Sequence, residues 1–171
     1  GHFDDPLQAG AVLPRVRFWQ AWNEPTLPIF LSPSKVEHYV PLLNGFYDAV
    51  KSVAYTNFVI AAGLAPVKSS RTAAYPLRFA AEMLCLKRRG RFSEHRFRGG
   101  RCAAGRARFD ALSIHPYSLG AKPGQSAAID GNVFIANVPT LAKMLRLAAL
   151  RGQVRITSAT QAGRDTLEPD G

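Results

Sequence analysis

FVIAAG, residues 58–63, is a short run of apolar residues that ends at a glycine. A run of this length without charge is typical of a parallel strand buried on both faces. Residues 34–54 before it carry apolar side chains at helical spacing, and residues 76–86 after it open with a proline suited to a first helical turn. The run therefore predicts a strand between two helices, the unit from which parallel sheets are built.

The start of the first helix carries its own signals. Ser34 and Glu37 form a capping-box pattern, so we expect the helix to begin there. Pro41 lies within the same segment, where a proline removes a backbone hydrogen bond. This proline predicts either a kink or a later start of the helix.

The alternation of strand and helix continues in both directions. Residues 15–22 (RVRFWQAW), 109–114 (FDALSI) and 153–157 (QVRIT) are expected strands, and residues 138–150 are an expected helix. The strand starts are far enough apart for strand–helix–strand crossovers and too far apart for hairpins between these strands. The sequence predicts an α/β fold with a parallel sheet, either an open doubly wound sheet or part of a (β/α)8 TIM barrel, which needs about 250 residues when complete.

Composition narrows the class of protein. The chain has 171 residues, of which 47% are hydrophobic and 20% charged, and this excludes a disordered tail, a collagen-like repeat and a coiled coil. No apolar run reaches the roughly 18 residues of a membrane span, so no membrane partner is expected. No GxGxxG or GxxxxGK[ST] pattern follows an expected strand, which removes the main support for nucleotide binding. Because the chain begins with Gly1, we expect it to be a fragment.

The net charge of +10 is concentrated in residues 87–108, KRRGRFSEHRFRGGRCAAGRAR, where nine Lys or Arg accompany one acidic residue. Glycines interrupt this segment and it lacks helical or strand periodicity, which predicts an exposed basic loop inserted between regular elements. Phe92 and Phe97 could stack on nucleic-acid bases. A solvated insertion is the favoured interpretation, and nucleic-acid binding is the less favoured one.

The two cysteines, Cys85 and Cys102, allow a single pairing around most of the basic segment. A disulfide in an exported protein and two free thiols fit the sequence equally well. The sequence lacks the second CxxC or the HxxxH that a metal site would need, so no metal or other cofactor is expected. Secretion is the favoured location.

Distinctive residues follow three of the expected strands at their carboxyl ends. Asn23 and Glu24 follow the first strand, His115 and Tyr117 follow the third, and Ser158 follows the last. In either architecture, the loops at the carboxyl ends of parallel strands form the active face. We therefore expect Glu24, His115 and Tyr117 to converge at one rim of the sheet.

Two of these strand ends resemble a known family. FWQAWNEP, residues 18–25, resembles the fourth-strand motif of retaining glycoside hydrolases of clan A, a large clan of barrel enzymes that includes family five cellulases and mannanases and family thirty-nine xylosidases. FDALSIHPY, residues 109–117, is similar to the sixth strand of the same clan, with its HxY signature. The resemblance implies a partial (β/α)8 barrel over residues 1–157, from strand four to strand seven, with residues 87–108 as an insertion.

The resemblance also implies a role for each residue. Glu24 matches the general acid and base, and Asn23 matches the residue that hydrogen-bonds the sugar 2-hydroxyl. His115 and Tyr117 match the pair that lines the sugar subsite, and Ser158 occupies the position of the nucleophilic Glu. The implied activity is hydrolysis of a β-linked oligo- or polysaccharide with retention of configuration.

Ser158 is the departure from the family pattern. Retaining hydrolysis needs a second carboxylate about 5–5.5 Å from the acid, and a serine cannot replace it. The polar tail 158–171 diverges from the family and supplies its acidic residues only further along the chain. We therefore expect an incomplete or inactive hydrolase, and a non-catalytic carbohydrate-binding fragment is the alternative.

Simpler roles for the same residues stay open. Asn23 and Glu24 would serve only as caps if their side chains bonded the turn that begins at Pro25. Trp19 and Trp22 are expected in the core rather than as platforms for a sugar ring, because aromatic residues on a barrel strand usually pack inside.

Overall fold

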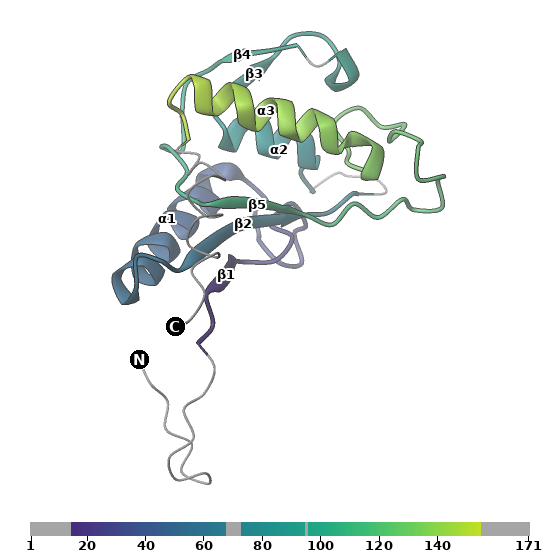
Figure 1. Ribbon diagram of the computed structural model, residues 1–171. Helices are drawn as coiled ribbons and strands as arrows, with labels where there is room; N and C mark the ends of the chain where they lie inside the picture. Colours follow the sequence, from purple (N-terminus) through teal and green to yellow (C-terminus); the bar gives the residue numbers. More distant parts are fainter. Residues whose placement is uncertain (1–14, 68–72, 95, 155–171) are drawn as a thin grey trace, which may run out of the picture.

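The computed structural model of the protein describes residues 15–67, 73–94 and 96–154 (Figure 1). Three strands, β1 (Phe18–Ala21), β2 (Phe58–Leu64) and β5 (Ala111–Ile114), form a parallel sheet in the order β1-β2-β5. The prediction of an α/β fold with a parallel sheet is confirmed. Within the described ranges the sheet does not close into a barrel. The tail 158–171, with Ser158, and most of the expected strand 153–157 lie outside the described residues.

Three helices accompany the sheet: α1 (Val36–Val53) packs on β1 and β2, α2 (Pro76–Met83) packs against α1, and α3 (Val138–Leu150) packs against α2. Figure 1 shows α3 running alongside α2. In the described part of the chain, no helix has the length and apolar character required to cross a membrane. The helix order follows the prediction, with ends within three residues of the expected ones.

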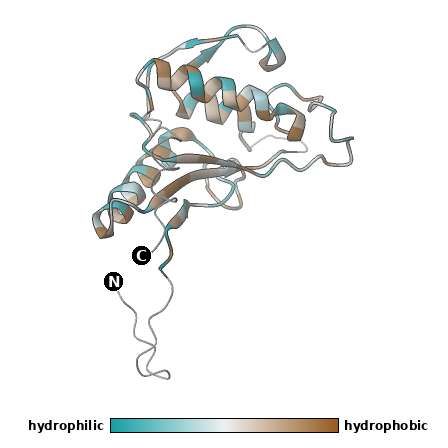
Figure 2. Ribbon diagram, viewed as in Figure 1, coloured by the Kyte–Doolittle hydropathy of each residue, from teal (hydrophilic) through white to brown (hydrophobic). Residues whose placement is uncertain are grey.

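The two faces of the sheet differ in burial. Ala21, Val59 and Ala61 are fully buried in the core with α1 and α2. On the opposite face, the rings of Phe18 and Phe58 lie 5.5 Å apart, and Phe18 is 65% exposed. Figure 2 shows how strongly apolar β2 and β5 are. The expected burial of β2 on both faces holds only toward its carboxyl end, because Phe58 at its start is only partly covered.

Tyr39 joins α1 to the sheet. Its side chain is fully buried, and its hydroxyl donates a hydrogen bond to the carbonyl oxygen of Ala21 at 2.8 Å. The same hydroxyl accepts a hydrogen bond from the N–H of Ala62 at 2.6 Å. One phenol therefore satisfies a buried acceptor at the end of β1 and a buried donor near the end of β2.

Asp110 fixes the beginning of β5. Its carboxylate accepts a hydrogen bond from the N–H of Val59 at 2.7 Å and lies 2.8 Å from the ammonium group of Lys51 on α1. The Asp110 side chain is only 8% exposed, so the ion pair compensates a largely buried charge. These contacts set the register of β5 against β2 and so determine where β5 ends.

The capping-box prediction for α1 is wrong. The helix begins at Val36 with Lys35 as the N-cap residue, and no side chain caps it. The Ser34 hydroxyl instead donates to the carbonyl oxygen of Leu31 at 2.8 Å, within the preceding turn. The later start expected from Pro41 is also wrong, since the helix runs through this proline.

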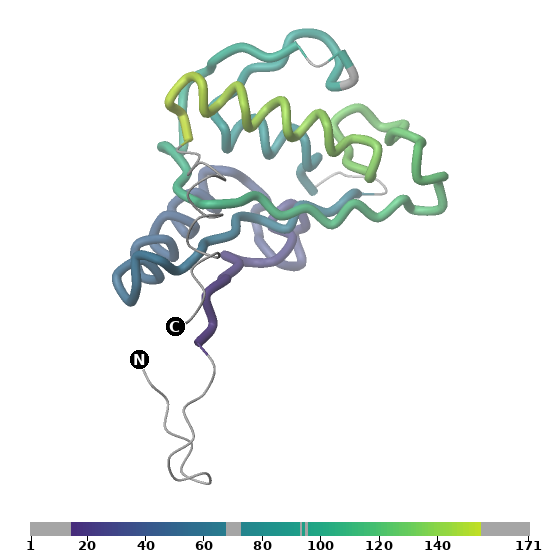
Figure 3. Tube along the Cα trace, viewed as in Figure 1, coloured from purple at the N-terminus to yellow at the C-terminus, as the bar shows by residue number. Residues whose placement is uncertain are grey.

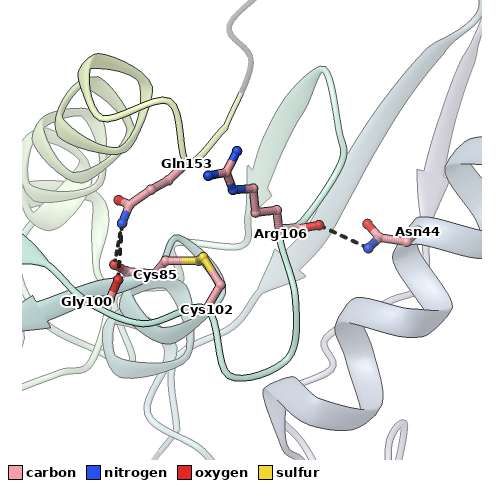
Figure 4. The surroundings of a disulfide bond; sticks show 6 residues. All are labelled: Asn44, Cys85, Gly100, Cys102, Arg106 and Gln153. Atoms are coloured by element: carbon pink, nitrogen blue, oxygen red, sulfur yellow. Dashed lines mark hydrogen bonds between the residues drawn. A yellow bond between two sulfur atoms is a disulfide. The ribbon is translucent and has the colours of Figure 1, made fainter.

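The basic segment is not the irregular loop predicted from sequence. Leu86–Arg88 (β3) and Phe97–Gly99 (β4) pair as an antiparallel hairpin, with a short 3₁₀ turn at Phe92–Glu94 between them. The sequence does not show this hairpin because each strand has only three residues and because Arg88 on its inner side is paired with the distant Asp130. Cys85 and Cys102 form a disulfide at the base of this hairpin, which decides between the two states that the sequence left open (Figure 4).

We expect Tyr39→Phe to lower the free energy of unfolding by about 1–3 kcal/mol, because the variant leaves the buried Ala62 N–H and Ala21 carbonyl without a partner. Chemical denaturation of both proteins measures the difference. Tyr47→Phe is the matched control, since Tyr47 is half-buried on the same helix and its hydroxyl has no hydrogen bond among the described residues. Equal losses in the two variants would contradict the bridging role of Tyr39.

Burial raises the pKa of the Tyr39 phenol above its ordinary value near 10, and the Ala62 N–H only partly opposes this rise. Because the folded pKa is the higher one, the unfolded chain loses this proton first as the pH rises. The stability that Tyr39 contributes is therefore complete below about pH 10 and is lost above it. We expect the stability difference between the wild type and Tyr39→Phe to shrink above pH 10 in denaturation curves; a constant difference would contradict this prediction.

Candidate active site

The carboxyl ends of the three parallel strands bring distant parts of the chain to one edge of the sheet. Figure 3 shows the chain leaving β2 and β5 toward the same end of the molecule. The N–H of His115, directly after β5, donates to the carbonyl oxygen of Leu64 at 2.8 Å. This bond continues the pairing of β5 with β2 by one residue and places the imidazole at the rim.

Glu24 and His115 form the central contact of the rim. The Nδ1 of His115 lies 2.7 Å from the Oε1 of Glu24, although 91 positions separate the two residues in sequence. The side chain of His115 is 25% exposed and that of Glu24 is 14% exposed, so the pair is largely shielded but still reached by solvent. With the proton on Nδ1, the imidazole donates to the carboxylate and fixes its orientation, while Oε2 of Glu24 has no partner among the described residues.

Tyr117 lies next to this pair. Its ring centroid is 6.0 Å from that of His115, and its side chain is 59% exposed. The N–H of Tyr117 donates to the carbonyl oxygen of His115 at 2.9 Å, which closes a tight turn around Pro116. The three residues expected at one rim are therefore brought together as Glu24 beside His115 and His115 beside Tyr117.

Asn23 is exposed, and within the described ranges its side chain makes no hydrogen bond. The alternative that Glu24 is only a cap is wrong, because its carboxylate binds His115 and only its backbone carbonyl accepts from the N–H of Leu27 in the following turn. Ser158, the remaining candidate, lies outside the described residues.

The expectation that Trp19 and Trp22 lie in the core is wrong. Trp19 is 39% exposed because β1 is an edge strand of the described sheet, and Trp22 is 46% exposed because its φ of 72° turns the chain out of the strand just after β1. The indole N–H of Trp22 donates to the carbonyl oxygen of Phe30 at 2.8 Å. Trp22 and Phe30 line an open, mostly apolar pocket, together with Gln20, Asn23 and Ile29.

Backbone strain gathers at the same strand ends. Trp22, Glu24 and Ala62 have φ angles of 72°, 45° and 71°, in the left-handed region that residues with a Cβ rarely adopt. Each such residue costs of order 1–3 kcal/mol and persists only where surrounding contacts hold it. Strain of this kind is typical of binding and catalytic sites, and here it turns Trp22 and Glu24 away from the regular path of a strand.

Gln20 and Gly63 belong to the rim, although the sequence did not single them out. The side-chain amide of Gln20 donates to the carbonyl oxygen of Trp22 at 3.0 Å. A Cβ at Gly63 would lie 2.9 Å from Nε2 of Gln20 and 3.2 Å from Nε2 of His115, so the glycine leaves these side chains their space. The available signals were the one polar residue within FWQAW and the glycine that ends FVIAAG.

The rim supplies one carboxylate. Of the residues that directly follow β1, β2 and β5, Glu24 is the only acidic one. Among the described residues, no group of three or more His, Cys, Asp or Glu side chains is arranged to hold a metal ion. What this arrangement can do on its own is hold a carboxyl group, exchange a proton through it, and present aromatic and amide groups beside it.

No family model, no curated protein and no solved structure matches this chain.

We expect Gly63→Ala to displace His115 from Glu24, since the added Cβ needs the space that the imidazole occupies. Gly105→Ala is the matched control, because Gly105 also has a positive φ, +83° against +81°, but nothing lies within 4 Å of its added Cβ. Both variants should lose roughly 1–2 kcal/mol of stability from backbone strain. Only Gly63→Ala should shift the imidazole NMR signals of His115; equal shifts in both variants would show that Gly63 does not set the rim geometry.

Proposed function

We propose that this rim is the acid–base side of a retaining glycoside hydrolase site, and that the chain binds a β-linked oligo- or polysaccharide there. The observation that carries the proposal is the 2.7 Å contact between Glu24 and His115 at the carboxyl ends of two strands of one parallel sheet. The two motifs that resemble clan A meet in this contact. If each segment resembled the clan only by chance, there would be no reason for Glu24 and His115 to lie in contact.

The fold is compatible with part of a (β/α)8 barrel, which we include in the proposal. The strands β1, β2 and β5 are parallel and their connections contain helices, while none of the described helices covers the face with Phe18 and Phe58. In a barrel, side chains of this inward face fill the interior. The proposal therefore assigns the covered face to the outside of a barrel and the face of Phe18 and Phe58 to its interior.

Glu24 is suited to proton transfer at a glycosidic oxygen. His115 holds Oε1, which leaves Oε2 to carry the proton toward the leaving oxygen and later to accept one from water. His115 acts as a positioning residue, because it touches the carboxylate rather than the sugar. The partial burial of both side chains shields this exchange from bulk solvent.

The pocket lined by Trp22 and Phe30, which Asn23 joins to Glu24 along the chain, is suited to a sugar ring. Trp22 and Phe30 present aromatic surface, and the hydrogen bond from the indole to the Phe30 carbonyl holds Trp22 in place. An aromatic ring covers the apolar face of a sugar, while the amides of Asn23 and Gln20 can pair with hydroxyl groups. Aromatic surface next to uncharged amides favours a neutral polyhydroxylated ligand.

Turnover needs a second carboxylate, which the described strand ends do not provide. Ser158, which lies outside the described residues, stands at the matched sequence position. The proposed function of this chain is therefore binding of a β-linked saccharide at a hydrolase-type rim without hydrolysis. This prediction differs from that of an intact hydrolase in one measurable property, the release of sugar.

We expect calorimetric titration with β-linked cello-, xylo- or mannohexaose to show one binding site. Glu24→Gln should weaken the affinity about tenfold, because a hydrogen bond to a charged group is replaced by one to a neutral amide. Glu37→Gln on the exposed surface of α1 removes the same charge and should leave the affinity unchanged. No binding by the wild type, or equal effects of the two variants, would reject the proposal.

The same protein should release no nitrophenol from aryl β-glycosides. Turnover that disappears in Glu24→Gln would show that the chain is an active hydrolase with Glu24 as its acid, and would overturn the prediction of binding without hydrolysis. Turnover that survives this substitution would show that the acid, and with it the family, is wrong.

A further inference from the structure

The hairpin carries a row of cations on its outer face. Lys87 lies opposite Arg98 in the antiparallel register, and the N–H of Arg89 donates to the carbonyl oxygen of Arg96 at 2.8 Å, which extends the pairing by one residue on each strand. Side chains alternate between the faces of a strand, so Lys87, Arg89, Arg96 and Arg98 share one face. All four are exposed, and we refer to them as the cationic face.

The inner face of the hairpin is compensated, whereas the cationic face is not. Arg88 points to the inner side, where it pairs with Asp130 and lies 4.8 Å over the ring of Phe92. On the cationic face, Glu94 lies 3.9 Å from Arg96 with both side chains exposed, a contact of little strength. Among the described residues, Lys87, Arg89 and Arg98 have no acidic partner.

This arrangement opposes the stability of the hairpin. Like charges directly across two strands destabilise the pair. Along each strand the cations are about 7 Å apart, and across the strands about 5 Å apart. A polyanion with closely repeated charges would relieve this repulsion at several points at once.

The base of the hairpin is held firmly. The disulfide between Cys85 and Cys102 ties its two ends, and the N–H of Gly100 donates to the carbonyl oxygen of Cys85 at 2.7 Å. The side-chain amide of Gln153, after α3, donates to the carbonyl oxygen of Cys85 at 2.9 Å, as Figure 4 shows. The cationic face is thus presented on a fixed scaffold, which lowers the entropy cost of binding.

We propose that the cationic face binds an anionic polysaccharide, one whose sugar units carry carboxylate or sulfate groups. Guanidinium groups pair with both anions through two parallel hydrogen bonds, which suits a face with three arginines. The disulfide is typical of oxidising compartments outside the cytosol. This inference does not depend on the function proposed for the rim, because the two surfaces share no residue.

The burial of the aromatic side chains favours a glycan over a nucleic acid. Phe92 is only 4% exposed, and Phe97 packs against it with ring centroids 6.0 Å apart on the inner side. The buried ring of Phe92 is not free to stack on a base, and the half-buried ring of Phe97 packs against it instead of standing on the exposed face. Readers of single-stranded nucleic acids combine positive charge with such exposed platforms.

The test compares two triple variants of the full chain. Lys87→Gln/Arg89→Gln/Arg98→Gln removes three cations of the face, and Lys35→Gln/Arg78→Gln/Lys122→Gln removes three exposed cations elsewhere. Binding to polygalacturonate, heparin, neutral cellohexaose and a duplex DNA is measured at 50 and 200 mM salt; these are chosen conditions that bracket physiological ionic strength. Polygalacturonate and heparin distinguish carboxylate from sulfate as the recognised group.

The first variant should bind the acidic glycans at least about tenfold more weakly, with a smaller loss on raising the salt, and the second within about twofold of the wild type. Equal losses of affinity in both variants would show that binding depends only on the net charge of the protein, and would overturn the proposal. Duplex DNA bound more tightly than either glycan, through the same three residues, would replace it by nucleic-acid binding.

A second measurement covers the case in which the first variant fails to fold. In the wild type, polygalacturonate or heparin should shift the backbone amide NMR signals of Lys87, Arg89 and Arg98 and leave those of Lys35 and Lys122 in place. Shifts confined to the rim, or no shifts at all, would overturn the proposal.

Discussion

The buried hydroxyl of Tyr39 is the contact on which the geometry of the rim depends. It bonds the carbonyl oxygen of Ala21, the last residue of β1, and the N–H of Ala62, near the end of β2. The backbone is left-handed at Trp22, the residue after Ala21, and at Ala62 itself. Such backbone persists only when firm contacts hold its neighbours. A side chain of α1 thus sets where Trp22 and, two residues later, Glu24 leave the sheet.

Asp110 anchors β5, the strand that carries His115, as Tyr39 anchors the ends of β1 and β2. By binding the N–H of Val59 and the ammonium group of Lys51, it fixes where β5 enters the sheet, and His115 follows at the opposite end of this short strand. A shift of one residue in β5 would move His115 to the other face, because side chains alternate along a strand. The contact between Glu24 and His115 therefore rests on two anchors in the interior, one for each strand.

The parallel strands and the meeting of Glu24 with His115 could be predicted from sequence, because apolar periodicity locates strands and parallel strands end at one edge. The hairpin could not, since its inner side is completed by a residue far along the chain, Asp130, which pairs with Arg88 and accepts from the N–H of Phe92. The exposure of Trp22 could not be predicted either, because it follows from a positive φ, which a tryptophan in a sequence does not indicate. Local patterns encode the elements, and long-range contacts decide what the segments between them do.

The distribution of charge fits the two proposed surfaces. Residues 20–34, 60–67 and 113–121, which surround the strand ends of the rim, contain no lysine or arginine. A neutral sugar carries no charge for a cation to pair with, so the lack of lysine and arginine in these segments suits the ligand proposed for the rim. The net charge of +10 is instead concentrated in residues 87–108, whose hairpin packs against α2 and α3. The two proposals accordingly assign a charged glycan to the hairpin and a neutral saccharide to the rim.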